Sequence, residues 1–214
     1  MTAGQGHDAV RLSYDAVAQS YEDALGDELS YKPLDRGLLS ALLEQSEPGW
    51  PIADIGCGPG HVAAFLASHG AAAVGIDLSP AMVAVGRSSH PDVQFRQGDM
   101  VALPATDGEF ASAVALYSII HLQPSELGPA FSEVHRALRP RGLFLVSFHL
   151  GTQVVHRSEW WGHQVDIDFR FYEKGPVIEA LVGAGFSLEA SLERSNYPEE
   201  VETLRAYLLG RRGG

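Results

Sequence analysis

The feature that most constrains the fold of this chain is an alternation of short apolar runs with amphipathic segments between residues 51 and 150. Strands that alternate with helices are typical of a mostly parallel sheet that is covered by helices on both faces. We therefore expect an α/β fold with a doubly wound sheet. The runs expected as strands are Pro51–Gly56, Ala72–Asp77, Val93–Asp99, Phe110–Ser118 and Gly142–Leu150.

Amphipathic segments before and between these runs predict helices, because their apolar residues recur at spacings of three and four. In one of them Ser79 is expected to be the N-cap, with Pro80 at the first helical position, where a missing N–H costs no hydrogen bond. The segments are the first 30 residues, Leu34–Gln45, His61–Gly70, Ser79–Ser89 and Leu127–Leu138.

The pattern changes after residue 150. Residues 151–172 are rich in Trp, His and Asp, and we expect an inserted lid or substrate-binding element in which Val165–Tyr172 alternates as a strand. Two later runs, Ala184–Arg194 and Val201–Arg211, are expected to form an antiparallel hairpin, which brings the sheet to about seven strands. We expect a single domain, 1–214, divided into an N-terminal helical lid (1–30), a ligand-binding core (31–150), the substrate-side insertion (151–175) and a C-terminal helix and β-hairpin (176–214).

Composition limits the partners. The chain carries a formal net charge of −12, and its scattered Lys and Arg residues do not predict nucleic-acid binding. It has no apolar run long enough to cross a membrane and no signal-peptide pattern, so we expect a cytoplasmic protein, monomer or homodimer, with no membrane partner. Cys57 is the one cysteine, which excludes an internal disulfide.

The glycine-rich turn Ile52–Gly60 ("IADIGCGPG") follows the first expected strand. Gly56, Gly58 and Gly60 run G-x-G-x-G, and the next residue is His61, so the dinucleotide fingerprint G-x-G-x-x-G is not satisfied. The turn has no Gly-Lys-Ser/Thr and no basic residue that could meet a phosphate. It therefore does not predict a diphosphate site.

Acidic residues end the first three strands instead. Asp54 precedes the glycines and could attract a cationic group, while Asp77 lies at the strand end where a carboxylate reaches both hydroxyls of a ribose. Asp99 ends the third strand and could accept the exocyclic amine of adenine. The combination predicts a ligand that contains ribose, adenine and a positive charge but no phosphate.

On these residues the chain resembles the class I S-adenosylmethionine-dependent methyltransferases of the small-molecule type, whose fold is Rossmann-like. The resemblance covers almost the whole chain and is specific for the cofactor rather than for the substrate. The matching segments are Ser13–Leu25 ("SYDAVAQSYEDAL"), Asp54–Gly60 ("DIGCGPG"), Gly75–Val83 ("GIDLSPAMV"), Gly98–Met100 ("GDM"), Ala115–Leu122 ("ALYSIIHL") and Arg136–Phe148 ("RALRPRGLFLVSF").

The resemblance implies S-adenosyl-L-methionine as cofactor. It places the glycines and Asp54 near the methionine part, Asp77 at the ribose, and Leu78 with Met82 beside the adenine. The cofactor-binding residues that it implies are Tyr14, Tyr21, Asp54, Gly56, Cys57, Gly58, Asp77, Leu78, Met82, Asp99, Met100 and Tyr117. Purely structural roles remain open for several of them: Met82 as a core residue, Tyr14 and Tyr21 as the buried face of a helix, and Cys57 as a small filler.

The acceptor side is less defined. His121 and His149 follow the fourth and fifth strands and are candidate catalytic bases for an acceptor that must lose a proton. His156, Trp160 and Trp161 are candidate substrate-binding residues. The histidines of this segment, His156 and His163, lie seven residues apart with no zinc-type spacing to a cysteine, which does not predict a metal site. The position after the fourth strand lacks the Asn/Asp-Pro-Pro-aromatic run of nucleobase amino-methyltransferases, which again disfavours nucleic acid.

The sequence thus predicts transfer of a methyl group from S-adenosylmethionine to an O, N or C atom of a small organic acceptor. Two alternatives stay open at this point. One is an enzyme that binds the same cofactor but performs other chemistry, such as cyclisation or decarboxylation, and the other is a non-catalytic, cofactor-binding partner subunit. An NAD-linked oxidoreductase is disfavoured because the third fingerprint glycine is absent.

Overall fold

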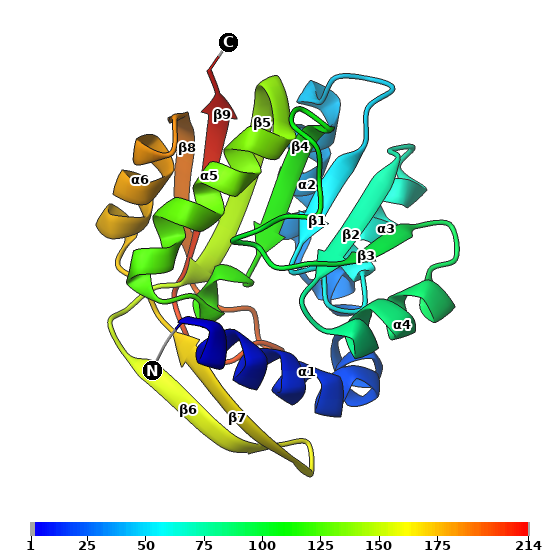
Figure 1. Ribbon diagram of the computed structural model, residues 1–214, viewed down its shortest axis with the longest axis vertical. Coiled ribbons are helices and arrows are strands. Elements are labelled where there is room, and N and C mark those ends of the chain that lie inside the picture. Colours follow the sequence, from blue (N-terminus) through cyan, green and yellow to red (C-terminus); the bar gives the residue numbers. More distant parts are fainter. Residues whose placement is uncertain (1–2, 214) are drawn as a thin grey trace.

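A seven-stranded sheet with helices on both faces forms the body of the molecule, described by a computed structural model for residues 3–213 (Figure 1). The strands lie in the order β3-β2-β1-β4-β5-β9-β8; the first five are parallel, and β9 runs antiparallel to both β5 and β8. This confirms the predicted Rossmann-like sheet and its C-terminal hairpin. The strands are β1 (Ile52–Ile55), β2 (Ala73–Asp77), β3 (Gln94–Gln97), β4 (Phe110–Leu116), β5 (Leu138–His149), β8 (Phe186–Arg194) and β9 (Arg205–Arg212).

The helices pack on the sheet through two apolar clusters. Because neighbouring strand residues point to opposite faces, Ile52 joins the cluster shared with α2, α3 and α4, and Ala53 joins the cluster shared with α5 and α6. No helix among the described residues has the length and apolar character needed to span a bilayer. The helices are α1 (Ala3–Leu25), α2 (Pro33–Gln45), α3 (His61–Ser68), α4 (Pro80–Ser89), α5 (Leu127–Ala137) and α6 (Lys174–Gly183), with 3₁₀ turns η1 (Glu28–Tyr31), η2 (Ile119–His121) and η3 (Pro124–Glu126).

The start of α4 confirms the predicted cap. Ser79 has an extended backbone, its side-chain oxygen accepts a hydrogen bond from the Met82 N–H at 3.1 Å, and Pro80 occupies the first turn. The Ser79 hydroxyl also donates to Asp15 on α1 at 2.6 Å. The cap therefore holds α1 beside the edge of the sheet where β2 ends.

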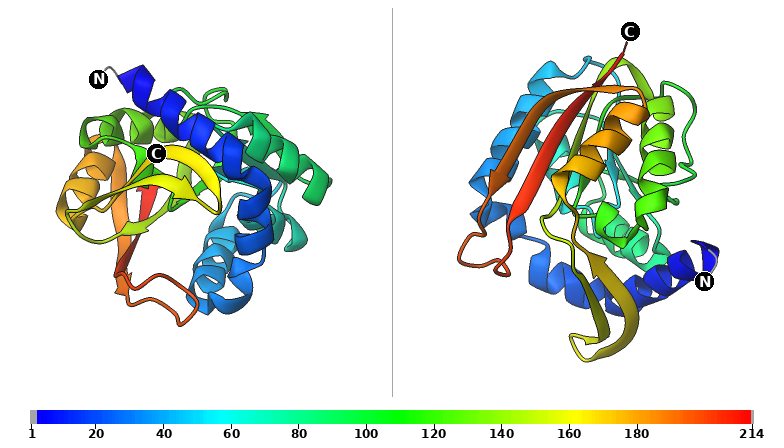
Figure 2. Two further views of the ribbon diagram at one scale, coloured as in Figure 1. Left: turned by 90° about the horizontal axis from the view of Figure 1, so that it is seen from below. Right: turned by 90° about the vertical axis from the view of Figure 1, so that its left-hand side faces the viewer.

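The inserted segment forms a second, two-stranded sheet, β6 (Val154–Trp160) and β7 (His163–Arg170). The sequence predicted β7 but not β6, because the alternation in β6 is broken by charged and exposed residues. Trp161 and Gly162 form the two-residue turn with φ of 49° and 80°, the positive values that a tight hairpin needs. The hairpin extends below the main sheet and lies along α1 (Figures 1 and 2), and the Asp166 N–H donates to the Ser13 hydroxyl at 3.0 Å.

A buried polar network ties α2 to the C-terminal hairpin. Arg194 on β8 pairs with Asp35 at 3.2 Å and with Glu200 at 2.6 Å, and these side chains are between 1% and 9% exposed. The Tyr207 hydroxyl donates to Asp35 at 2.9 Å and lies 2.9 Å from the Tyr117 hydroxyl at the end of β4. The guanidinium of Arg194 thus compensates two carboxylates that are withdrawn from water.

We expect Arg194→Ala to lower the free energy of unfolding by about 3 kcal/mol or more, because it removes the ion pair of buried Asp35 and the shortest ion pair of buried Glu200. Lys174→Ala is the matched control: Lys174 pairs with Glu193 at the surface, where an ion pair contributes under about 1 kcal/mol. Urea titrations followed by circular dichroism measure both. Equal losses in the two variants would show that the buried network adds no stability.

Candidate functional site

A cavity of about 790 Å³ lies beyond the carboxyl ends of the strands, where the strand order reverses between β1 and β4. α1 and the β6–β7 hairpin lie side by side below this edge of the sheet (Figure 2), and residues of both line the cavity. All but two of the site residues expected from the sequence line this cavity. The residues that do so are Tyr14, Tyr21, Asp54, Gly56, Cys57, Gly58, Asp77, Leu78, Asp99, Met100, Tyr117, His121, His149, Trp160 and Trp161.

The two exceptions are corrections to the sequence prediction. Met82 is fully buried and packs against Val17 and Ala18 between α4 and α1, so it is a core residue rather than a wall of the cavity. His156 lies on the outer face of β6, with a side chain that is 54% exposed and bonded to Asp168 at 3.0 Å. Alternation along a strand does not say which of its two faces is buried. The outward position of His156 could therefore be assigned only from the pairing register of the hairpin.

The glycine turn owes its sequence to a close approach between two loops. Gly56 has φ of +70°, and a Cβ added to it would lie 2.2 Å from the Cβ of Ser118 in the turn after β4. Gly58 also has a positive φ, +54°, but an added Cβ would meet only Tyr21, at 3.8 Å. Gly56 therefore brings the loops after β1 and β4 together, and Gly58 serves the turn itself.

The Asp77 carboxylate faces the cavity from the end of β2. It accepts hydrogen bonds from the Gly58 N–H at 2.7 Å and from the Ser79 N–H at 2.8 Å, one on each oxygen. Burial raises the pKa of Asp77 to about 6, although the backbone donors oppose this rise. Each oxygen has a further lone pair, so the group can still accept two hydroxyls of a ligand.

Two other acids from the same edge are held differently. Asp54 accepts the Ala63 N–H of α3 at 3.0 Å, and burial raises its pKa to about 7. Asp99 accepts the Val101 N–H at 3.0 Å and lies 2.6 Å from the Nδ1 of His7, whose other ring nitrogen is 3.1 Å from Glu126. His7 thus links the start of α1 to this edge, a contact that no local motif in the sequence indicated.

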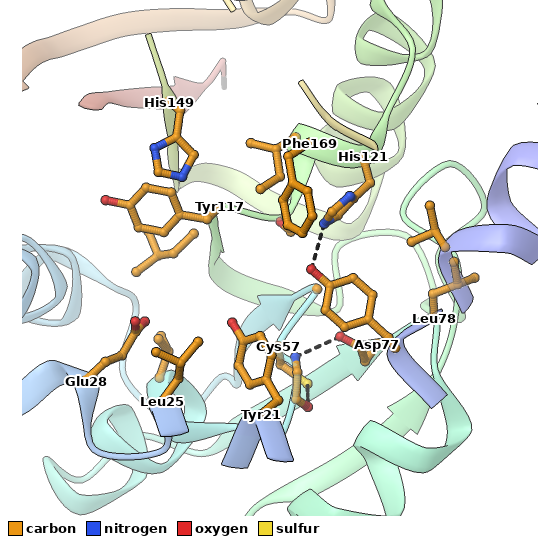
Figure 3. A pocket seen from close by; sticks show the side chains of 18 of the residues that line it. Tyr21, Leu25, Glu28, Cys57, Asp77, Leu78, Tyr117, His121, His149 and Phe169 are labelled. Carbon is orange, nitrogen blue, oxygen red and sulfur yellow. Dashed lines mark hydrogen bonds between the residues drawn. The ribbon is translucent and has the colours of Figure 1, made fainter. Parts of the chain in front are cut away.

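The side chain of His121 points into the cavity (Figure 3), where Tyr14 also lines the wall. The Tyr14 hydroxyl is 2.7 Å from the His121 Nε2, and the His121 Nδ1 is 3.0 Å from the carbonyl oxygen of Asp168. A carbonyl only accepts, so Nδ1 carries the proton and Nε2 accepts the Tyr14 O–H. Burial lowers the pKa of His121 to about 4 and raises that of Tyr14, which keeps both groups neutral near pH 7.

His149 lies across the cavity from His121 (Figure 3). Its ring stacks between Tyr117 and Phe171, with centroid distances of 5.1 and 5.2 Å, and its Nδ1 is 2.9 Å from the Thr203 hydroxyl. Burial, helped by the nearby charge of Arg205, lowers its pKa to about 4. The cavity therefore has a neutral imidazole on each side.

A polar group at the junction of α1 and α2 was missed by the sequence analysis. Glu28 lies 2.6 Å from the Lys32 ammonium and 3.0 Å from the Nε2 of His61, and Lys32 is also 3.5 Å from Glu200. Burial opposes ionisation of Glu28, but His61 and Lys32 outweigh it and hold its pKa at about 2. The Nδ1 of His61 is buried without a partner. The four-residue spacing of Glu28 and Lys32 was the one local signal of this group.

Aromatic rings close the cavity on the side of the hairpin. Trp160 and Trp161 stack at 4.6 Å, and Trp160 contacts Tyr14 at 5.8 Å and Tyr21 at 6.0 Å between ring centroids. Phe169 on β7 adds an edge-to-face contact with Trp160 at 5.3 Å. The two predicted tyrosines of α1 therefore do face the cavity, and the predicted tryptophans form its lid.

The chain is similar to known methyltransferases. Residues 52–142 match a family model described as a methyltransferase domain. An uncharacterized methyltransferase of Synechocystis is 35% identical over 103 residues, 48% of this chain and 49% of that protein. A malonyl-[acyl-carrier protein] O-methyltransferase of Dechloromonas aromatica is 31% identical over 209 residues, 92% of this chain and 74% of that protein. The chain thus spans about half the length of the first relative and most of the second.

Among solved structures, the 1,6-didemethyltoxoflavin-N1-methyltransferase of Burkholderia thailandensis is similar with a TM-score of 0.76. The sequences are 18% identical, and the superposition covers 100% of this chain and 92% of the other. That structure holds 1,6-didemethyltoxoflavin and S-adenosylhomocysteine. The likeness shows that the two chains share a fold.

We expect Gly56→Ala to destabilise the chain more than Gly58→Ala. Both substitutions add the strain of a positive φ, about 1–2 kcal/mol, but only Gly56→Ala also forces a methyl group against Ser118, which adds about 1–3 kcal/mol. Thermal melting of the two variants measures the difference. Equal melting temperatures would mean that the loops after β1 and β4 separate without cost.

Proposed function

This chain belongs to the S-adenosylmethionine-dependent methyltransferases, and we propose that it transfers the methyl group of S-adenosylmethionine to an O, N or C atom of a small organic acceptor. The observation that carries the proposal is the buried Asp77 carboxylate, which faces a cavity of about 790 Å³ and retains lone pairs for two hydroxyls. A cavity of this size accommodates a small acceptor beside the cofactor.

The residues present fit the cofactor. Asp77 would hold the ribose hydroxyls, and Leu78, Asp99 and Met100 line the part of the cavity that would hold adenine. Asp54, which burial keeps near the point of ionisation, would face a cation rather than a phosphate.

The methionine end has a matching polar pocket. Glu28 and Lys32 offer one charge of each sign, and the unpartnered Nδ1 of His61 is the kind of buried atom that requires a ligand contact. A zwitterionic amino-acid group satisfies all three. We therefore add Glu28, Lys32 and His61 to the cofactor-binding residues.

When bound, the cofactor supplies a methyl group on a sulfonium that is already a good leaving group. The chain's own residues have to align the acceptor, exclude water and manage its proton. The rings of Tyr21, Trp160 and Trp161 cover the cavity and exclude water from the bound cofactor.

The Tyr14–His121 pair takes up the proton that the acceptor loses. An acceptor hydroxyl can donate to the Tyr14 oxygen while the Tyr14 proton moves to the His121 Nε2, 2.7 Å away. The Asp168 carbonyl accepts the Nδ1–H and keeps Nε2 free of its own proton. His149, whose Nε2 has no hydrogen bond to a described residue, orients the acceptor from the other side.

We expect S-adenosylhomocysteine to bind at least about tenfold more weakly at pH 5 than at pH 8, because charged acceptors contribute about 1.5–3 kcal/mol per hydrogen bond. The pKa of Asp77 is about 6, so the carboxylate is ionised above that pH and protonated below it. Asp54, with a pKa of about 7, acts in the same direction. Calorimetric titration at both pH values measures the change.

The variant Asp77→Ala tests whether Asp77 causes this pH dependence of binding. It should bind weakly at both pH values, and circular dichroism checks that the turn at Gly58 and Ser79 survives. Binding of Asp77→Ala with wild-type affinity would remove Asp77 from the site, and binding of NADH in place of S-adenosylhomocysteine would overturn the cofactor assignment.

With acceptors that react through O–H, we expect Tyr14→Phe and His121→Gln each to lower kcat by about 100-fold or more, the lower end of what a positioned proton acceptor contributes. Affinity for S-adenosylhomocysteine should change less than about tenfold, because neither polar atom is needed for the cofactor. Formation of S-adenosylhomocysteine at saturating cofactor, across a panel of phenols and amines, measures kcat.

His156→Gln is the matched control, since this histidine lies on the outer face of the hairpin. An unchanged kcat in Tyr14→Phe would reduce the pair to scaffold. If the wild type binds the cofactor but forms no S-adenosylhomocysteine with any acceptor, the chain performs other chemistry or acts as a binding subunit.

A further inference from the structure

Arg157 lies on the face of the β6–β7 hairpin that is turned towards the cavity. The register pairs it with Ile167 across the hairpin, and Ile167 is buried, while the neighbouring pair Val155 and Phe169 lines the cavity. Arg157 also lines the cavity, and its guanidinium lies 6.0 Å from the centre of the Phe169 ring. Arg157 is exposed to solvent while it lines the cavity, so its guanidinium can reach a ligand that enters there.

The other cations of the cavity are paired or assigned to the cofactor. Lys32, which contacts Glu28 and Glu200, belongs to the pocket proposed for the amino-acid group of the cofactor, and Arg205 lies 3.3 Å from Glu200. Arg157 forms no ion pair with a carboxylate of the described residues, and its one charged neighbour along the strand on this side is Glu159. With both imidazoles neutral, Arg157 is the cation available to an anionic ligand.

Flat rings surround the space between Arg157 and the proton-accepting pair. His121 contacts Tyr14 and Phe169 edge to face, each at 5.2 Å. Tyr117 and His149, whose rings are tilted by 35° at a centroid distance of 5.1 Å, line another part of the cavity. Such walls favour a planar aromatic ligand, which gains offset and edge-to-face contacts on both sides.

We propose that the acceptor is a planar aromatic compound that carries a carboxylate, which Arg157 binds, while its reacting group faces Tyr14 and His121. This inference rests on the proposed function and specifies its substrate class. The guanidinium matches a carboxylate in bidentate geometry, and the Phe169 ring under it restricts where the charge can lie. Arg157 is thus a specificity-determining residue.

The test measures binding rather than turnover, in protein saturated with S-adenosylhomocysteine. The probes are three aromatic acids and their amides: salicylic acid and salicylamide, caffeic acid and caffeamide, anthranilic acid and anthranilamide. Quenching of tryptophan fluorescence reports binding, because two of the three tryptophans, Trp160 and Trp161, line the cavity, and calorimetry checks it. We expect at least one acid to bind about tenfold or more tightly than its amide, the effect of a hydrogen-bonded charge pair.

Arg157→Gln should abolish the preference for an acid over its amide. Glu159→Gln is the matched control: it also removes a charge from β6, and it should retain the preference. The inference is overturned if no acid is preferred by the wild type, or if the preference survives in Arg157→Gln. Failure of S-adenosylhomocysteine to bind at all would instead overturn the proposed function. The two failures are therefore distinguishable within one titration series.

Discussion

The reversal of strand order between β1 and β4 is the constraint on which the rest of the site depends. Parallel strands deliver their loops to the same edge of the sheet, and at the reversal the loops after β1 and β4 diverge and leave a cavity. Gly56 lets the two loops approach each other closely, because it has no Cβ to collide with Ser118. Asp77 closes the arrangement from β2 by binding the Gly58 N–H. Backbone topology, a missing side chain and one carboxylate thus fix the end of the cavity that we propose for the cofactor.

The acceptor end is built from segments outside the parallel strands. α1 contributes Tyr14, the turn after β4 contributes His121, and β7 contributes the carbonyl of Asp168 that orients the imidazole. Three separate elements therefore have to be in place before the proposed proton acceptor is complete. Residues of α1 and of the hairpin also line the cavity, so the packing that covers the cavity is the packing that brings Tyr14 and His121 together. In the proposed mechanism, closing the cavity and assembling the proton acceptor therefore depend on the same contacts.

The sequence predicted the parts of this structure that local chemistry determines. The strand–glycine–helix pattern, the Ser79 cap and the acids at the strand ends follow from periodicity and backbone geometry. The Tyr14–His121 contact spans 107 positions and the His7–Asp99 contact 92, and neither leaves a local pattern. Met82 was misplaced for a related reason: a methionine one turn into a helix fits a core as well as a cavity wall, and only the packing of α1 decides. His156 and Arg157 differ by one position, and the hairpin register alone assigns them to opposite faces.

Four titratable groups of the site, Asp54, Asp77, His121 and His149, share one electrostatic feature. Burial favours the neutral form of each, and the neighbouring groups offset this only in part. The pKa values of Asp54 and Asp77 are raised by burial, and those of His121 and His149 are lowered by it, so desolvation moves every one of these groups towards its neutral form. For the acids, a cationic ligand supplies the missing compensation and restores the charge that binds it. For the histidines, neutrality keeps a lone pair available for a proton and avoids repulsion of a sulfonium. The proposed site can therefore hold a cation at one wall and receive a proton at the other, because burial raises the pKa of its acids and lowers the pKa of its histidines.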